Sequence, residues 1–390
     1  MKLLGTDRAT LSACALATRE FTFAALCCLG RHITVNTVGR LRECVDLIVK
    51  GSAFQHVRSL DLGITTQRVI HERDWGDYLV ILEFFARRRT LTRLWFSEVP
   101  FYLSKSRMQE MLRNTIISLA ATVNELGLYS CHFSCHTEMI SLIRAFPLCT
   151  SLFVRDCVTK KNPRAAIFAQ LPQHTLHISD LELTSSSGHR FQSDVSTLVE
   201  DAALDISSLT DFSCDMSTAD AARCTVMAVA KSPIKRFQLI CDEAEGFLGT
   251  SDSPGNAPIL LTAVSVLEDP AVTRWPLKSL TFGPLIQRDN WWCERVLLLS
   301  PNLPHLEDIT ILGRGQRPGR HASGFWRRLD RLFSRQDIFP RLERLDICMT
   351  VGSRGNRYGE QWGIVQYLPA LHRAGKVYFW GGKCRYILPQ

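Results

Sequence analysis

The sequence lacks the features of membrane-embedded or secreted disulfide-rich proteins. No stretch approaches the roughly 18 uncharged apolar residues of a membrane span, and charges interrupt the opening residues where a signal peptide has an apolar core. No Asn-x-Ser/Thr glycosylation site occurs. The 14 cysteines are scattered through 390 residues rather than gathered in a dense framework, so we expect reduced thiols. We therefore expect a cytoplasmic or nuclear protein with no membrane partner.

The sequence also lacks the short motifs of common catalytic and cofactor sites. It contains no G-x-S-x-G, no phosphate-binding G-x-x-x-x-G-K-[ST], no G-x-G-x-x-G after a strand and no H-E-x-x-H. Residues 131–136, CHFSCH, gather two cysteines and two histidines. A structural zinc usually takes two separated pairs of ligands, and no second cluster stands at a matching distance. We expect no metal, no other cofactor and no enzyme activity.

What the sequence contains instead is one short unit repeated along most of its length. Residues 123–131 read VNELGLYSC and residues 149–157 read CTSLFVRDC, with apolar residues at relative positions one, four and six and cysteine at nine. The offset of 26 residues between 123 and 149 is typical of short structural repeats. The apolar spacing occurs ten times in all, and its fourth positions are Leu60, Leu94, Leu126, Leu152, Leu181, Phe212, Phe237, Leu280, Ile309 and Leu345.

Each unit predicts a strand followed by a helix. Apolar and polar residues alternate within the unit, as in a half-buried strand. Apolar residues at three- and four-residue spacings predict helices at 106–123, 136–146, 218–231 and 290–300. A doubly wound α/β sheet also alternates strand and helix, but its strands are covered on both faces and read as continuous apolar runs. Here polar residues such as Asp61 and Glu125 leave one face open, which favours an α/β solenoid with a curved sheet.

The repeat resembles the cysteine-containing class of leucine-rich repeats, in a degenerate form. Only Cys131 and Cys157 hold the ninth position cleanly. The resemblance implies a leucine-rich-repeat-like solenoid over residues 46–390, preceded by a short helical cap at residues 1–45.

Residues 3–26 are similar to the second half of an F-box. The residues that fall on this pattern are Asp7, Leu11, Ala13, Cys14, Leu16, Arg19 and Phe21, with Phe21 where tryptophan is usual. On this alignment the chain begins at the last residues of the first F-box helix, so residues 1–45 are a partial F-box-like segment.

Taken with the repeats, the chain resembles fungal F-box proteins with leucine-rich-repeat-like C-terminal regions. The resemblance implies the substrate-binding subunit of a cullin-type ubiquitin ligase, in which Leu11, Cys14, Leu16 and Phe21 would contact a Skp-type adaptor. Alternatively, these residues cap the solenoid, and the chain is a leucine-rich-repeat binding scaffold without a ligase.

The net charge of +8 is concentrated near the C-terminus. Nine arginines lie between Arg314 and Arg344, against three acidic residues. Apolar residues in this segment fall at helical spacing: Phe325, Leu329, Leu332 and Phe333. We therefore expect the arginines within residues 325–339 on a solvated helix face and do not expect nucleic acid as a partner.

The open strand face is the surface that we expect to bind a protein target. Trp95, Tyr129, Phe153 and Arg155 occupy polar-side positions of three consecutive strands. Alternation would place them side by side on the concave surface of the solenoid. Aromatic residues and arginine are enriched among the residues that dominate protein–protein binding energy.

Overall fold

The computed structural model describes most of the repeats but not the N-terminal segment. The described residues are 31–49, 54–63, 72–101, 106–159, 168, 170–184, 203–215, 229–240, 275–285, 303–314, 322–350 and 364–381. They belong to two compact units, one of residues 1–178 and 201–205 and one of residues 179–200 and 206–390. The F-box-like residues Leu11, Cys14, Leu16 and Phe21 lie outside the described residues, as do nearly all of the helices expected at 218–231 and 290–300.

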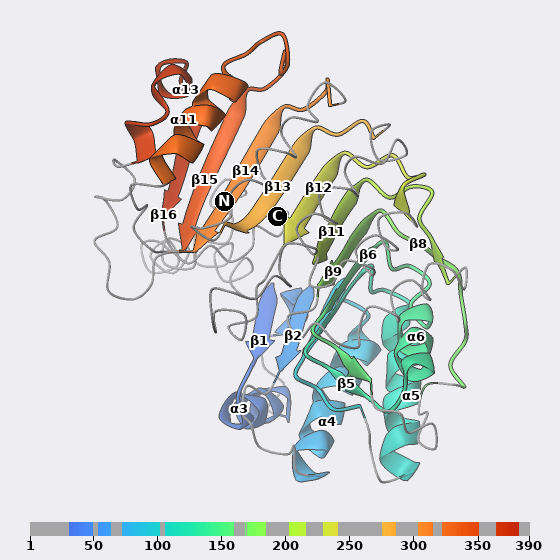
Figure 1. Cartoon of the computed structure of the whole chain (residues 1–390). Coiled ribbons are helices and arrows are strands. Elements are labelled where there is room, and N and C mark those ends of the chain that lie inside the picture. The colour runs from blue at the N-terminus through green and yellow to red at the C-terminus, as the bar shows by residue number, and fades with distance from the viewer. Residues whose placement is uncertain are drawn as a thin grey trace, which may run out of the picture. The chain divides into compact units, whose positions relative to one another are not determined.

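The first unit alternates strands with helices that cover one face of its sheet (Figure 1). Its elements are β1 (His32–Val35), α3 (Val38–Val49), β2 (Ser59–Gly63), α4 (Glu72–Arg88), β3 (Arg93–Ser97), α5 (Ser106–Ala120), β4 (Glu125–Tyr129), α6 (His136–Arg144) and β6 (Ser151–Arg155). Short parallel pairs join β5 (His132–Phe133) to β7 (Val158–Thr159) and β8 (Leu176–His177) to β10 (Leu204–Asp205). The helices expected at 106–123 and 136–146 are thus confirmed as α5 and α6, and the boundary expected at residue 45 falls inside α3.

In the second unit, the described residues form mainly strands, with helices near the end of the unit. Its elements are β9 (Asp180–Thr184), β11 (Asp211–Asp215), β12 (Arg236–Ile240), β13 (Ser279–Leu285), β14 (Asp308–Arg314), α11 (Ala322–Phe333), β15 (Arg344–Thr350), α13 (Pro369–Arg373) and β16 (Val377–Gly381). Five long strands of the first unit and seven of the second are described, and within each unit they pair in parallel in sequence order. A doubly wound sheet reverses its strand order at a switch point, and neither described unit does so.

The strand register confirms the repeat alignment. Leu60, Leu94, Leu126 and Leu152 are direct partners on successive strands of the first unit. The fourth-position residues of the second unit align likewise, from Leu181 through Phe212, Phe237, Leu280 and Ile309 to Leu345. All ten are buried and form the core beneath the strands.

Two of the described long strands, β1 and β16, were not predicted from the sequence. In β1, Ile33 pairs with Leu60, and in β16, Val377 pairs with Leu345. Both therefore stand at the fourth position of a repeat. Their repeats carry Gly30 and Ala374 at position one, where a larger apolar residue defines the pattern elsewhere.

The same backbone hydrogen bonds recur where each strand begins. One carbonyl accepts two successive N–H groups from the next strand: Arg58 O accepts from Thr92 N at 2.9 Å and from Arg93 N at 3.0 Å. In the second unit, Lys235 O accepts in the same way from Lys278 N at 2.8 Å and Ser279 N at 3.1 Å. The repeats are therefore equivalent in backbone geometry, although their sequences and lengths differ.

A second recurring feature is the turn that follows β3, β4 and β6. The residues just past these strands, Glu98, Ser130 and Asp156, all have positive φ, at 58°, 49° and 53°. One residue further on, the Cys131 thiol donates to Phe96 O at 3.3 Å and the Cys157 thiol donates to Leu128 O at 3.5 Å. Burial raises the pKa of Cys157 well above its ordinary value, so this thiol acts as a hydrogen-bond donor rather than a nucleophile.

The reduced state expected of the cysteines holds for only part of the set. Among the described residues, Cys44, Cys131, Cys135, Cys149, Cys157 and Cys214 have free thiols. Cys348 is disulfide-bonded, so the prediction is wrong at this position. Scattered spacing identifies the lack of a dense disulfide framework, but it does not exclude a single bond between residues that folding brings together.

The arginine-rich segment forms the expected amphipathic helix. In α11, Trp326, Leu329 and Phe333 are buried, while Arg327, Arg328 and Arg331 are exposed. The buried Asp330 accepts hydrogen bonds from Ala370 N at 3.1 Å and Leu371 N at 2.9 Å, which ties α11 to the start of α13. Arg344 is not part of this helix: it lies on β15, within the repeat whose fourth position is Leu345, and pairs with Asp346 at 2.8 Å.

None of the helices in the described part of the chain is long and apolar enough to cross a membrane.

Candidate functional site

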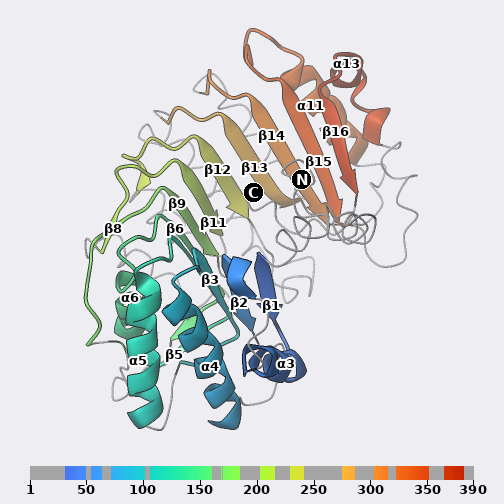
Figure 2. The ribbon, with the colours of Figure 1, turned by 180° about the vertical axis from the view of Figure 1, so that it is seen from behind.

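The candidate site is the open face of the first unit, defined here as the β2, β3, β4 and β6 residues that alternate with the buried fourth- and sixth-position residues. Strand register arranges these residues in rows across the sheet. Arg93, Glu125 and Ser151 form one row, and Trp95, Gly127 and Phe153 form the next. Figures 1 and 2 show α4, α5 and α6 on the opposite side of these strands.

Trp95 is the centre of the open face because its indole ring lies across the neighbouring strand. A Cβ added to Gly127 would lie 2.4 Å from the Trp95 ring, so the indole rests directly on the Gly127 backbone. The ring reaches Phe153 on β6, where the two aromatic rings stack with centroids 5.2 Å apart. A strand glycine marks a close approach to the backbone, and here the approaching group is the tryptophan of the adjacent strand.

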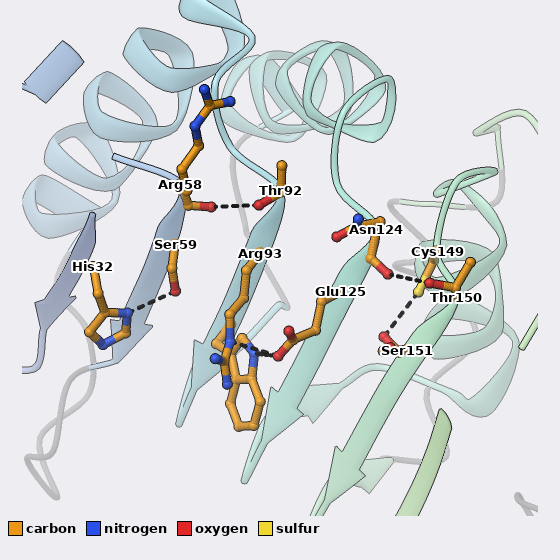
Figure 3. A network of polar contacts seen from close by, with 11 residues as sticks. His32, Arg58, Ser59, Thr92, Arg93, Asn124, Glu125, Cys149, Thr150 and Ser151 are labelled. Carbon is orange, nitrogen blue, oxygen red and sulfur yellow. Dashed lines mark hydrogen bonds and ion pairs between the residues drawn. The ribbon is translucent and has the colours of Figure 1, made fainter. Parts of the chain in front are cut away.

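A charged pair holds the other side of the indole. Arg93 Nε lies 2.6 Å from Glu125 Oε1, and the Trp95 Nε1–H donates to the same carboxylate oxygen at 3.0 Å. The Arg93 guanidinium also stacks over the Trp95 ring, 4.8 Å from its centroid. Figure 3 shows Arg93 and Glu125 pointing toward one another from adjacent strands. The aromatic centre is thus fixed in one orientation by hydrogen bonding, stacking and cation–π attraction.

Burial raises the pKa of the Glu125 carboxyl, against the opposing effects of Arg93 and the Trp95 donor. The folded state therefore binds this proton more readily than the unfolded chain. The contribution of Glu125 to stability consequently falls as the pH rises from the unfolded to the folded pKa of this carboxyl.

We expect Arg93→Gln to raise the pKa of Glu125 further. The substitution removes the guanidinium charge that favours the ionised carboxylate, while the desolvation remains. NMR titration of the Glu125 side-chain carboxyl would measure both values. Arg58→Gln is the matched control, because Arg58 is exposed and donates to Thr90 O instead. An unchanged or lower pKa in Arg93→Gln would contradict this account.

The two remaining predicted residues form a second contact on the same face. Tyr129 and Arg155 are direct register partners, and the guanidinium of Arg155 lies 5.7 Å from the Tyr129 ring centroid. Tyr129 is 36% exposed, whereas Phe153 is only 7% exposed. The four predicted residues therefore lie on one face, where they form one stacked pair and one cation–π pair.

Sequence reasoning missed Arg93, Glu125 and Gly127. Glu125 was interpreted only as a polar residue of the open face, and Arg93 was not singled out, although their register makes them partners. Of the three, Gly127 could have been identified from the sequence, because glycine inside an otherwise alternating strand indicates a close backbone contact.

The residues of the CHFSCH segment have separate structural positions. Cys131 lies in the turn after β4, His132 lies in β5, and Cys135 is the N-cap residue of α6. No group of three or more His, Cys, Asp or Glu residues is placed to hold a metal ion among the residues that the structure describes.

Comparison with known proteins identifies no family. No family model matches the chain, and no curated protein matches it. A crystal structure of a Bacteroides fragilis protein aligns over 84% of this chain and 75% of that one, with 12% sequence identity and a TM-score of 0.37. A similarity at this level supports no argument about fold or function.

Proposed function

We propose that this chain is a non-enzymatic protein–protein recognition module that binds a protein target on the open face of its first unit. The observation that carries the proposal is the Trp95 indole, which lies over Gly127 and stacks on Phe153. A rigid aromatic centre with arginines beside it has the composition of a binding hot spot. Fixing these side chains before binding also lowers the entropic cost of association.

The repeats are proposed to be of the leucine-rich-repeat type, and the whole chain to be the substrate-binding F-box subunit of a cullin-type ubiquitin ligase. Two observations support the leucine-rich-repeat type. The Cys131 and Cys157 thiols donate hydrogen bonds to carbonyls of the preceding strand, and the same backbone hydrogen bonds recur where each strand begins. The F-box-like sequence at Leu11, Cys14, Leu16 and Phe21 supports the role in a ubiquitin ligase. The alternative is a leucine-rich-repeat scaffold with no ligase.

Co-purification with a Skp-type adaptor tests the ligase role. The full chain should form a stable complex, and a variant with Leu11→Asp and Leu16→Asp should not. Residues 31–390 provide a truncation that leaves β1 intact, since β1 begins at His32. If the full chain is folded and binds no adaptor, the ligase role is refuted and the scaffold alternative remains.

Photo-cross-linking tests target binding separately. A cross-linking residue in place of the exposed Tyr129 should capture one defined protein in cells, and Trp95→Ala should abolish that product. The same residue at Leu47, which is 44% exposed on α3 and lies away from the open face, is the matched control. Equal capture from both positions, or capture unaffected by Trp95→Ala, would refute the open face as the binding surface.

A further inference from the structure

A groove lies between α4 and α5, on the side of the first unit away from the open face. The two helices pack side by side in both views (Figures 1 and 2). Their hollow has a volume of about 460 Å³. It is lined by Glu83, Ala86, Arg87 and Arg89 from α4 and its end, and by Met111, Asn114, Thr115 and Ser118 from α5.

The hollow exists because the α5 side chains facing it are short or fold back onto their own helix. The Thr115 hydroxyl donates to Met111 O at 2.8 Å, and the Ser118 hydroxyl donates to Asn114 O at 3.0 Å. These residues recur at spacings of three and four, so they form one continuous stripe along α5. The α5 side of the groove therefore extends along the helix axis from Met111 to Ser118.

The charge at one end of the groove is positive. Arg87 has a side chain 81% exposed, and Arg89 is also exposed. Glu83 is the acidic residue of the lining, and it bonds to Arg87 at 3.2 Å. A basic residue at a helix C-terminus complements the helix dipole, which accounts for Arg87 but not for Arg89. Arg89 lies beyond the helix at a φ of 52°, where glycine would be less strained.

Exposed apolar side chains on α4 and α5 lie about one helical turn from lining residues of the groove. Val80 is 39% exposed and precedes Glu83 by three residues on α4, and Ile117 is 45% exposed and follows Asn114 by three residues on α5. With the half-buried Met111, they provide apolar surface next to the arginines. A groove with apolar surface next to arginines suits a helix that presents apolar residues at spacings of three and four, with carboxylates beside them.

We propose that the α4–α5 groove is a second binding site, which takes a short amphipathic helix with an acidic polar face from a partner protein. The apolar residues of this helix lie in the hollow over Ala86 and Met111, and its carboxylates pair with Arg87 and Arg89. Charge complementarity favours an acidic partner helix, because the rim of the groove carries more positive than negative charge. This site is independent of the open face and of the function proposed for it.

The test is fluorescence anisotropy on the full chain with a labelled peptide of two copies of Leu-Glu-Glu-Leu-Ala-Glu-Glu. The control peptide has lysine in place of every glutamate. We expect saturable binding of the acidic peptide only, weakened as salt is raised. The variant with Arg87→Glu and Arg89→Glu should bind at least about tenfold more weakly, because repulsion replaces attraction at both positions. Ser118→Trp should also weaken binding by filling the hollow.

The matched control carries Arg328→Glu and Arg331→Glu, a pair of exposed arginines on α11, and should retain the affinity of the unmodified chain. Trp95→Ala should retain it too, which separates this site from the open face. Circular dichroism confirms that each variant is folded. Lack of saturable binding, equal binding of the lysine peptide, or unchanged affinity in the Arg87 and Arg89 variant would each overturn the proposal.

Discussion

Gly127→Ala is expected to displace the Trp95 indole and to abolish target binding at the open face. The new Cβ would lie 2.4 Å from the ring, where no Cβ contact is tolerated. The indole must then leave Phe153 and Glu125, so the stacking and the Nε1 hydrogen bond are lost together. Overpacking of this kind costs about 1–3 kcal/mol of folding free energy. Denaturant unfolding measures the stability, and loss of the Tyr129 cross-link measures the binding.

Gly76→Ala is the matched control for that substitution. Gly76 lies inside α4, and a Cβ there would meet nothing within 4 Å. Because alanine is the better helix former, this change should stabilise the protein by about 0.5–1 kcal/mol and leave binding intact. Opposite signs for the two glycines would support the contact described for Trp95. A neutral Gly127→Ala with unchanged binding would contradict it.

The repeat pattern predicted the strands because its fourth and sixth positions must face the same core. The fourth position is easily recognised at Leu126 and Leu152. It is also recognisable at Phe212 and Phe237, because an aromatic ring fills the same buried position as leucine. The strands β1 and β16 escaped prediction because their half-buried Ile33 and Val377 lack a large apolar residue three positions earlier. The disulfide at Cys348 escaped because spacing in the sequence does not report distance in space.

The candidate site was predictable in position but not in its contacts. Alternation alone placed Trp95, Phe153 and Tyr129 on one face. It could not show that the Trp95 ring crosses β4 to reach Phe153, because this depends on the side-chain torsion angles and on the space above Gly127. Pairing of Arg93 with Glu125 likewise required the register between two strands, which a single strand pattern does not specify.

Glu138→Ala is expected to be among the most destabilising substitutions in the first unit. Glu138 is 0% exposed in α6, and its carboxylate accepts from Ser134 N at 2.7 Å and from the Ser134 hydroxyl. The N-cap residue, Cys135, makes no side-chain cap hydrogen bond, so this carboxylate anchors the chain just before the helix. Alanine would leave both Ser134 donors buried without this acceptor, at about 1–3 kcal/mol each. We expect a loss of about 2–6 kcal/mol in urea unfolding.

Two further variants distinguish the lost hydrogen bonds from a general effect of cavity formation. Glu138→Gln keeps an acceptor oxygen and nearly the same volume, so it should lose less stability than Glu138→Ala. In the combination of Ser134→Ala with Glu138→Ala, the buried hydroxyl is removed as well, and its desolvation cost disappears. The double variant should therefore be less destabilised than the sum of the single ones. Strict additivity would mean that Ser134 and Glu138 act independently, and their contact would not be the source of stability at the start of α6.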